Sequence, residues 1–141
     1  MIEPLPPRAT IGILGGGQLG RMLAMAAARL GLRAHIYDPA TEPPAGDVAA
    51  AVTTAGWDDN AALDAFASAV DVVTWEFENI PLAVVERLAT ARPVRPGLAA
   101  LAASQDRLAE KRFLAGLGLR TAPFADIPDP GALPAALAVT G

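Results

Sequence analysis

The sequence is poorest in the residue types that build metal and redox sites. It has no cysteine and a single histidine, His35, among 141 residues. The absence of cysteine excludes disulfides, zinc–thiolate sites and a thiolate nucleophile. One histidine leaves no basis for a histidine-rich metal site or a serine–histidine–aspartate triad. We therefore expect no metal ion to be bound by these residues.

Basic runs and long apolar runs are missing as well. The 11 basic residues are outnumbered by 15 acidic ones, which gives a net charge of −4 and no surface suited to the phosphates of nucleic acid. No apolar stretch approaches the ~20 residues that a membrane-spanning helix requires. The N-terminus also lacks the basic start and apolar core of a secretory signal. We expect neither nucleic acid nor a membrane as a partner, and a cytoplasmic location.

What the sequence does contain is a regular alternation of apolar strands and alanine-rich helices. Hydrophobic residues make up 52% of the chain but aromatic residues only 5%, so the expected core consists of Val, Leu, Ile and Ala. The alternation predicts an α/β fold of the Rossmann-like kind, an open parallel sheet with helices on both faces. We expect strands at 10–14, 33–37, 49–53, 70–75 and 93–95, and helices at 18–30, 61–69, 81–91, 97–102, 105–117 and 132–139. Ser104 is the expected cap of the helix at 105–117.

The motif that organises the chain is the glycine loop, residues 15–20, between the first strand and the first helix. Gly15, Gly17 and Gly20 fit the spacing G-x-G-x-x-G. A helix start after such a turn carries partial positive charge and suits an anion. Asp38 follows Gly20 by 18 residues, about where an acidic residue holds a ribose hydroxyl of a dinucleotide. The spacing alone leaves two interpretations open, a dinucleotide site and close packing of strand against helix.

A second polar cluster follows the strand at 70–75. Glu76, Glu78 and Asn79 lie at its carboxyl end, and the two carboxylates point the same way if the chain stays extended. Phe77 is then the expected anchor between them. Because the carboxyl ends of parallel strands meet at one sheet edge, these residues should lie near the glycine loop. Carboxylates there suit ribose hydroxyls or an amine; a solvated turn before Pro81 is the alternative.

Charged residues also crowd the expected helix at 105–117. Arg107 and Lys111 are four residues apart and share a face, while Arg107 and Glu110 are spaced to form an ion pair. On spacing alone, a solvated surface is the simpler interpretation.

In this order, the motifs resemble the N5-carboxyaminoimidazole ribonucleotide synthase family, the ATPase subunit of phosphoribosylaminoimidazole carboxylase in the ATP-grasp superfamily. The resemblance extends over residues 10–141 and rests on residues 15–22, 73–81, 105–111 and 119–124. It implies an ATP-dependent ligase of de novo purine biosynthesis that joins bicarbonate to 5-aminoimidazole ribonucleotide. ATP and Mg²⁺ are the implied cofactors and a homodimer the implied assembly.

The resemblance also implies roles for particular residues. The implied pocket for 5-aminoimidazole ribonucleotide consists of Gly15, Gly16, Gly17, Gln18, Leu19 and Glu76. Arg107 matches the family's ATP-contacting arginine. Glu78, Asn79 and Lys111 stand in family motifs as secondary candidates, and no catalytic residue is assigned.

The resemblance covers only the N-terminal domain of that family. The lysines, glycine-rich flap and Mg²⁺ ligands of an ATP-grasp domain have no counterpart here, and phosphoryl transfer depends on such clamps. We expect a flexible lead-in at 1–9, a Rossmann-like pre-ATP-grasp domain at 10–120 and the start of a linker at 121–141. Such a fragment is not expected to turn over ATP by itself.

Three functions remain open on the sequence alone. They are a substrate-binding domain of a carboxylating ligase, a dinucleotide-binding module of an oxidoreductase and a non-catalytic dimerisation domain. Within the superfamily, Gln18 favours the aminoimidazole substrate, because the similar glycinamide ribonucleotide transformylase family carries glutamate there.

Overall fold

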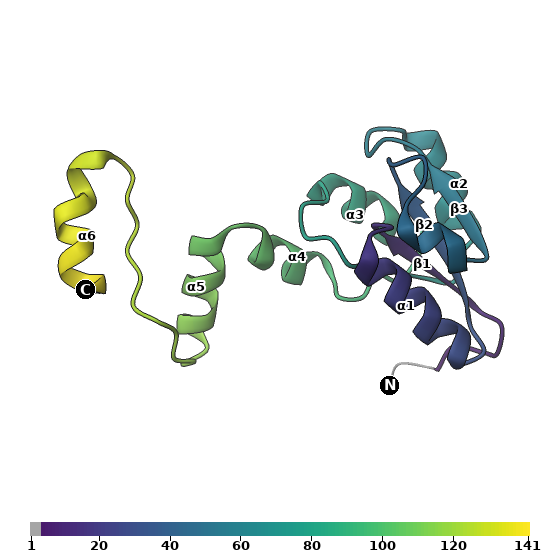
Figure 1. Ribbon diagram of the computed structural model, residues 1–141, viewed down its shortest axis with the longest axis horizontal. Coiled ribbons are helices and arrows are strands. Elements are labelled where there is room, and N and C mark those ends of the chain that lie inside the picture. Colours follow the sequence, from purple (N-terminus) through teal and green to yellow (C-terminus); the bar gives the residue numbers. More distant parts are fainter. Residues whose placement is uncertain (1–3) are drawn as a thin grey trace. The chain divides into compact units, whose positions relative to one another are not determined.

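The computed structural model describes residues 4–141, and these divide into two compact units that meet in sequence between Leu101 and Ala102 (Figure 1). The first unit holds the strands, and the second holds helices and an extended segment. The elements are β1 (Thr10–Leu14), α1 (Gln18–Arg29), β2 (Arg33–Asp38), η1 (Pro44–Val48), β3 (Ala51–Thr54), α2 (Asn60–Ser68), β4 (Val72–Trp75), α3 (Leu82–Ala89), α4 (Leu98–Gln105), α5 (Arg107–Gly116), η2 (Pro130–Ala132) and α6 (Leu133–Thr140). Residues 1–3 of the expected lead-in lie outside the described residues.

The sheet is entirely parallel, with the strand order β3-β2-β1-β4. The first strand is central, because Ile13 pairs with Ile36 of β2 on one side and with Thr74 of β4 on the other. Parallel neighbours require crossover connections, and helices provide them here. The predicted Rossmann-like α/β class is confirmed.

The strand expected at 93–95 is reduced to one bridge, between Val94 and Val73. Prolines stand at positions 93 and 96, and proline has no N–H to donate to a ladder. The expectation of a full strand at 93–95 was therefore wrong.

Neighbouring residues of the central strands are buried on opposite faces of the sheet. Ile13 and Ile36 pack in a cluster with Ala24 of α1 and residues of η1. Leu14 and Tyr37 belong to the larger cluster formed with α2 and α3. Because side chains alternate across a strand, both faces are covered, as expected for a parallel sheet.

Helix α1 turns its smallest side chains inward. Gly20, Ala24 and Ala27 are buried, whereas Met22 and Leu23 are 64% and 40% exposed. Apolar residues at helical spacing therefore form two faces of this helix, a buried face of small residues and an exposed face of larger ones. Only the small-residue face meets the sheet.

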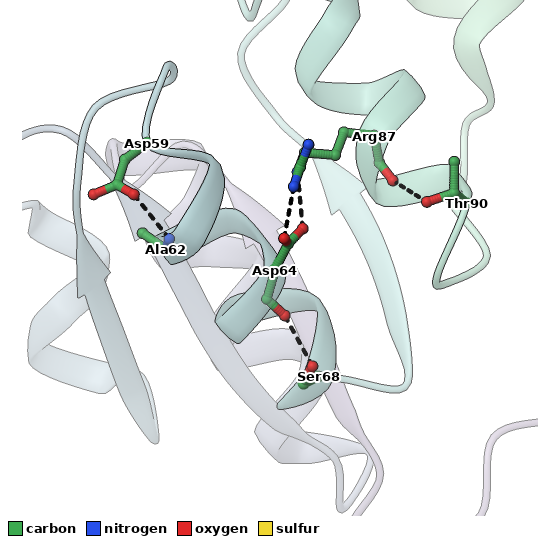
Figure 2. A network of polar contacts seen from close by, with 6 residues as sticks. All are labelled: Asp59, Ala62, Asp64, Ser68, Arg87 and Thr90. Carbon is green, nitrogen blue, oxygen red and sulfur yellow. Dashed lines mark hydrogen bonds and ion pairs between the residues drawn. The ribbon is translucent and has the colours of Figure 1, made fainter.

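An ion pair joins α2 to α3 beside the larger cluster (Figure 2). Nε and Nη2 of Arg87 donate to the two carboxylate oxygens of Asp64 at 2.8 and 2.6 Å. The hydrogen bond from Arg87 lowers the pKa of Asp64. At the start of α2, the Asp59 carboxylate accepts the Ala62 N–H at 2.9 Å and so caps the helix.

His35 is a buried ionisable side chain, 9% exposed. Its Nε2 lies 2.8 Å from Oγ1 of Thr53, and its ring meets the ring of Phe66 edge-on. Burial lowers the pKa of His35 below its ordinary value of 6.5.

This burial predicts a pH-dependent stability. Because the fold prefers the neutral form of His35, this side chain stabilises the folded state fully above about pH 6.5. The stabilisation decreases as the pH falls from there through the folded-state pKa. We expect the Tm to fall over that interval, and to fall less steeply in His35→Gln. Thermal unfolding followed by circular dichroism at stepped pH measures both curves. Parallel curves for the two proteins would contradict the prediction.

In the second unit, α5 begins at Arg107 and its cap is Asp106, not Ser104. The Asp106 carboxylate accepts the Ala109 N–H at 2.7 Å, while Ser104 lies within α4. Both residue types are good caps, and the extended backbone needed at a cap occurs at Asp106, with φ −120° and ψ 123°. The helix ends at Gly116, one residue before the predicted end, and Gly118 follows with φ +74°.

Candidate functional site

The glycine loop leaves β1 by a turn that requires glycine. Gly15 has φ +97°, a region that residues with a Cβ rarely adopt. Its N–H donates to the carbonyl of Tyr37 at 3.0 Å, which continues the pairing of β1 with β2. A Cβ at Gly15 would lie 2.9 Å from Oε1 of Glu76. The turn therefore places the loop directly beside the carboxylate of Glu76, the residue that follows β4.

Two carboxylates accept the N–H groups of the loop. Gly16 donates to Oδ2 of Asp38 at 2.6 Å, and Gly17 donates to Oε1 of Glu76 at 3.2 Å. The other oxygen of Asp38 accepts the N–H of Ala40 at 2.7 Å. The predicted meeting of glycine loop, Asp38 and Glu76 at one edge of the sheet is thus observed.

This arrangement counts against a pyrophosphate at the loop. In a phosphate cradle the N–H groups point at the anion, but here Gly16 and Gly17 already donate to carboxylates. A phosphate in the same place would be repelled by two negative groups. Asp38 also has a different role from the one its spacing suggested, because both of its oxygens accept backbone N–H groups.

Glu76 is placed by the sheet itself. Its N–H donates to the carbonyl of Leu14 at 3.1 Å, one residue beyond the end of β4. Its Oε1 holds the loop, and within residues 4–141 no hydrogen bond reaches Oε2. Gln18 and Leu19 are exposed next along the chain. The edge therefore offers a free carboxylate oxygen and an amide, groups that bind hydroxyls and amines.

Glu78 and Asn79 do not continue the strand. They are exposed and lie in a turn, since β4 ends at Trp75. The expected anchor was wrong: Phe77 is 43% exposed, and Ile80 is the residue buried at this point. The alternation of an extended chain does not persist through a turn, so the inward position shifts along the sequence.

Arg107 and Lys111 belong to the second unit and lie on one pocket there. Its volume is about 280 Å³, and its lining residues are Arg107, Leu108, Lys111, Phe124, Ala125, Asp126 and Ile127. Arg107 pairs with Glu110, as the spacing indicated, and remains 80% exposed. Nζ of Lys111 lies 5.8 Å from the centre of the Phe124 ring, a cation–π contact. Lys111 thus holds the extended segment after α5 against the helix.

The residues described here do not fit a Mg²⁺ site. Over residues 4–141, no group of three or more acidic, histidine or cysteine side chains is placed to hold a metal ion. Nor does any helix in that range have the length and hydropathy needed to cross a bilayer.

The sheet order, the glycine turn and the strand-end carboxylates define a Rossmann-like α/β domain. In its glycine loop, two backbone N–H groups already donate to carboxylates of the protein itself. Residues 8–105 match the family model of the ribonucleotide synthetase preATP-grasp domain. The chain belongs to this family.

The relatives of this chain are ribonucleotide synthetases. It is 50% identical over 137 residues to N5-carboxyaminoimidazole ribonucleotide synthase of Brucella melitensis biotype 1. The aligned region covers 97% of this chain and 38% of the relative. A crystal structure of an N5-carboxyaminoimidazole ribonucleotide synthetase in complex with ADP matches with a TM-score of 0.90 and 34% identity, over 100% of this chain and 40% of that one. The synthase of Aspergillus clavatus in complex with ADP and 5-aminoimidazole ribonucleotide matches with a TM-score of 0.75 and 30% identity, over 91% and 35%. The chain therefore spans about two fifths of the length of such relatives.

Proposed function

We propose that this chain is the N-terminal substrate-binding part of a ligase that carboxylates 5-aminoimidazole ribonucleotide with bicarbonate, using ATP, in de novo purine biosynthesis. The product is N5-carboxyaminoimidazole ribonucleotide and the place of action is the cytoplasm. The relatives support this reaction class by their names. The observation that carries the proposal for these residues is the free Oε2 of Glu76 beside a loop whose N–H groups are already bound to carboxylates.

This geometry favours the ribose and amine end of the ribonucleotide at the loop, rather than its phosphate. The Glu76 carboxylate accepts from hydroxyl or amine donors, and the Gln18 amide both donates and accepts. In this proposal the backbone of Gly15, Gly16 and Gly17 forms the floor of the ligand site, and the exposed Leu19 supplies an apolar edge. Glu78 and Asn79, in the exposed turn, are secondary contacts in this proposal.

ATP, Mg²⁺ and bicarbonate are assigned to the longer protein. ATP supplies the phosphoryl group that activates bicarbonate. From the residues described here, Arg107 is the proposed contact to ATP, with Lys111 as a secondary one, and the pocket beside them is at the small end of ligand-binding pockets. No residue of this range is proposed as a Mg²⁺ ligand or a catalytic group.

Calorimetric titration of the chain with 5-aminoimidazole ribonucleotide, and separately with NAD, tests the proposal. We expect heat of binding for the ribonucleotide and none for NAD. Ribose 5-phosphate is the matched control, because it keeps the phosphoribosyl group and lacks the aminoimidazole. Binding of NAD without binding of the ribonucleotide would show that the loop is a dinucleotide site after all.

We also propose that the chain forms a homodimer through the α1 stripe, defined as Met22, Leu23, Ala26 and Leu30. Met22, Leu23 and Ala26 share one exposed face of α1, and Leu30, the C-cap of this helix, is 77% exposed. With Ala26 on a two-fold axis, two antiparallel copies of α1 approach closely and Met22 meets Leu30 of the partner subunit. The stripe is therefore self-complementary and carries no charge.

Sedimentation equilibrium of Leu30→Glu, which places a carboxylate opposite the apolar Met22 of the partner subunit, tests this interface. A buried, unpaired carboxylate opposes association, so we expect a monomer where the unaltered chain is a dimer. Leu137→Glu, at a 54% exposed leucine of α6, is the control and should remain dimeric. A dimer in both variants would exclude the α1 stripe, and a monomeric unaltered chain would exclude the assembly.

A further inference from the structure

Asp38, the last residue of β2, ties together two loops at the sheet edge. Its Oδ2 accepts the N–H of Gly16 in the glycine loop at 2.6 Å. Its Oδ1 accepts the N–H of Ala40, in the segment after β2, at 2.7 Å. The carbonyl of Gly16 in turn accepts the N–H of Ala45 at 2.9 Å. Gly16 is thus held on its N–H side by the last residue of β2 and on its C=O side by a residue that follows β2.

Asp38 and Glu76 differ in how many of their carboxylate oxygens bind to the protein itself. Both oxygens of Asp38 are used within the protein, whereas Glu76 uses one to hold Gly17 and keeps the other free. Hydrogen bonds to an ionised carboxylate are shorter and stronger than neutral ones, and the two at Asp38 are short. Asp38 is therefore equipped to hold the loop, and Glu76 to meet a ligand.

The two carboxylates are coupled through the backbone. One planar peptide carries both the Gly16 carbonyl, which accepts the Ala45 N–H, and the Gly17 N–H, which donates to Glu76, so the placing of Gly16 sets the direction of the Gly17 N–H. If Gly16 leaves Asp38, the N–H of Gly17 loses its direction toward Glu76. The free oxygen of Glu76 then loses the contact that orients its carboxylate.

We propose that Asp38 is a positioning residue, which fixes the glycine loop so that Gly17 holds the Glu76 carboxylate toward the ligand. Its effect on affinity rests on the proposed function, whereas its effect on the loop does not. Removing the carboxylate should speed hydrogen exchange at Gly16 and Gly17 by about 10-fold or more, the factor expected for one lost hydrogen bond to a charged group. Affinity for 5-aminoimidazole ribonucleotide should fall with it.

The test compares Asp38→Ala and Asp38→Asn with Asp71→Asn in the 141-residue chain. Asp71 is a matched control, because its Oδ2 also accepts a backbone N–H, that of Thr10 at 2.7 Å, at the opposite end of β1. Amide exchange by NMR reports Gly16 and Gly17 in the free protein, and calorimetry reports the ribonucleotide. We expect both readouts to change in Asp38→Ala, to change less in Asp38→Asn, which keeps one oxygen acceptor, and to stay unchanged in Asp71→Asn.

Each outcome is decisive for the inference. Unaltered exchange at Gly17 in folded Asp38→Ala overturns it, whatever the ligand does; if that variant does not fold, the same result in Asp38→Asn overturns it. Equal exchange at Gly17 in the Asp38 and Asp71 variants also overturns it, because the effect is then general destabilisation. If the unaltered chain binds no ribonucleotide, the proposed function fails, while faster exchange at Gly17 still supports the positioning role.

Discussion

Replacing Glu76 by alanine should weaken the binding of 5-aminoimidazole ribonucleotide by about 10- to 100-fold, the range that corresponds to a lost hydrogen bond to a charged group. The substitution removes the free oxygen proposed to meet the ligand and also the acceptor of the Gly17 N–H. Both losses act on the same edge of the sheet. Calorimetric titration of the chain, and of a longer relative carrying the equivalent substitution, measures the change.

Two further variants separate the ligand contact from the loop contact. Glu76→Gln keeps an oxygen that accepts from Gly17 but removes the charge, so we expect a smaller loss of affinity than in Glu76→Ala. Asp58→Ala removes an exposed carboxylate from the loop that precedes α2 and should leave the affinity unchanged. Full affinity in Glu76→Ala would remove Glu76 from the site.

The central βαβ unit was predictable because its signals are local. Thr10–Leu14 is short, apolar and rich in β-branched residues, and three glycines end it where the helix must begin. The errors occurred where local patterns allow two solutions. Ser104 and Asp106 are both good caps, and the residue types alone do not tell which of the two backbones becomes extended. Periodicity in α1 does not reveal which face is buried, because small and large apolar residues both recur at helical spacing.

The meeting of the glycine loop with the strand-end carboxylates could also be predicted, but not the hydrogen bonds between them. The rule that parallel strands bring their carboxyl ends to one edge placed the glycine loop, Asp38 and Glu76 together. It did not indicate that Asp38 would bind the loop instead of a ribose. That role depends on distances of 2.6 and 2.7 Å to two N–H groups from different loops, and spacing along the chain does not encode them. Hence a motif of the dinucleotide type occurs here without a free phosphate cradle.

Gly20→Ala should destabilise the chain even though alanine is the better helix former. Gly20 lies in the first turn of α1, and helix propensity alone predicts a gain of about 0.5–1 kcal/mol in the free energy of unfolding. A Cβ at this position would lie 2.5 Å from the carbonyl oxygen of Gly15, which is backbone and cannot rotate away. Relieving that contact must move α1 or the glycine loop. Forced overpacking of this kind costs about 1–3 kcal/mol, so the net change should be a loss.

Urea unfolding of Gly20→Ala, followed by circular dichroism, gives this change in free energy. Ala28→Gly measures how much the difference in helix propensity between alanine and glycine changes the free energy of unfolding in the same helix. Ala28 is exposed, so its replacement alters no packing. Movement of the loop should also disturb Gly15, whose carbonyl is the atom approached and whose turn carries the loop to Glu76. We therefore expect Gly20→Ala to lose ribonucleotide affinity as well as stability, whereas Ala28→Gly loses stability alone. A more stable Gly20→Ala would mean that α1 can move away from the glycine loop without loss of stability. The close approach of Gly20 to Gly15 would then not affect the site.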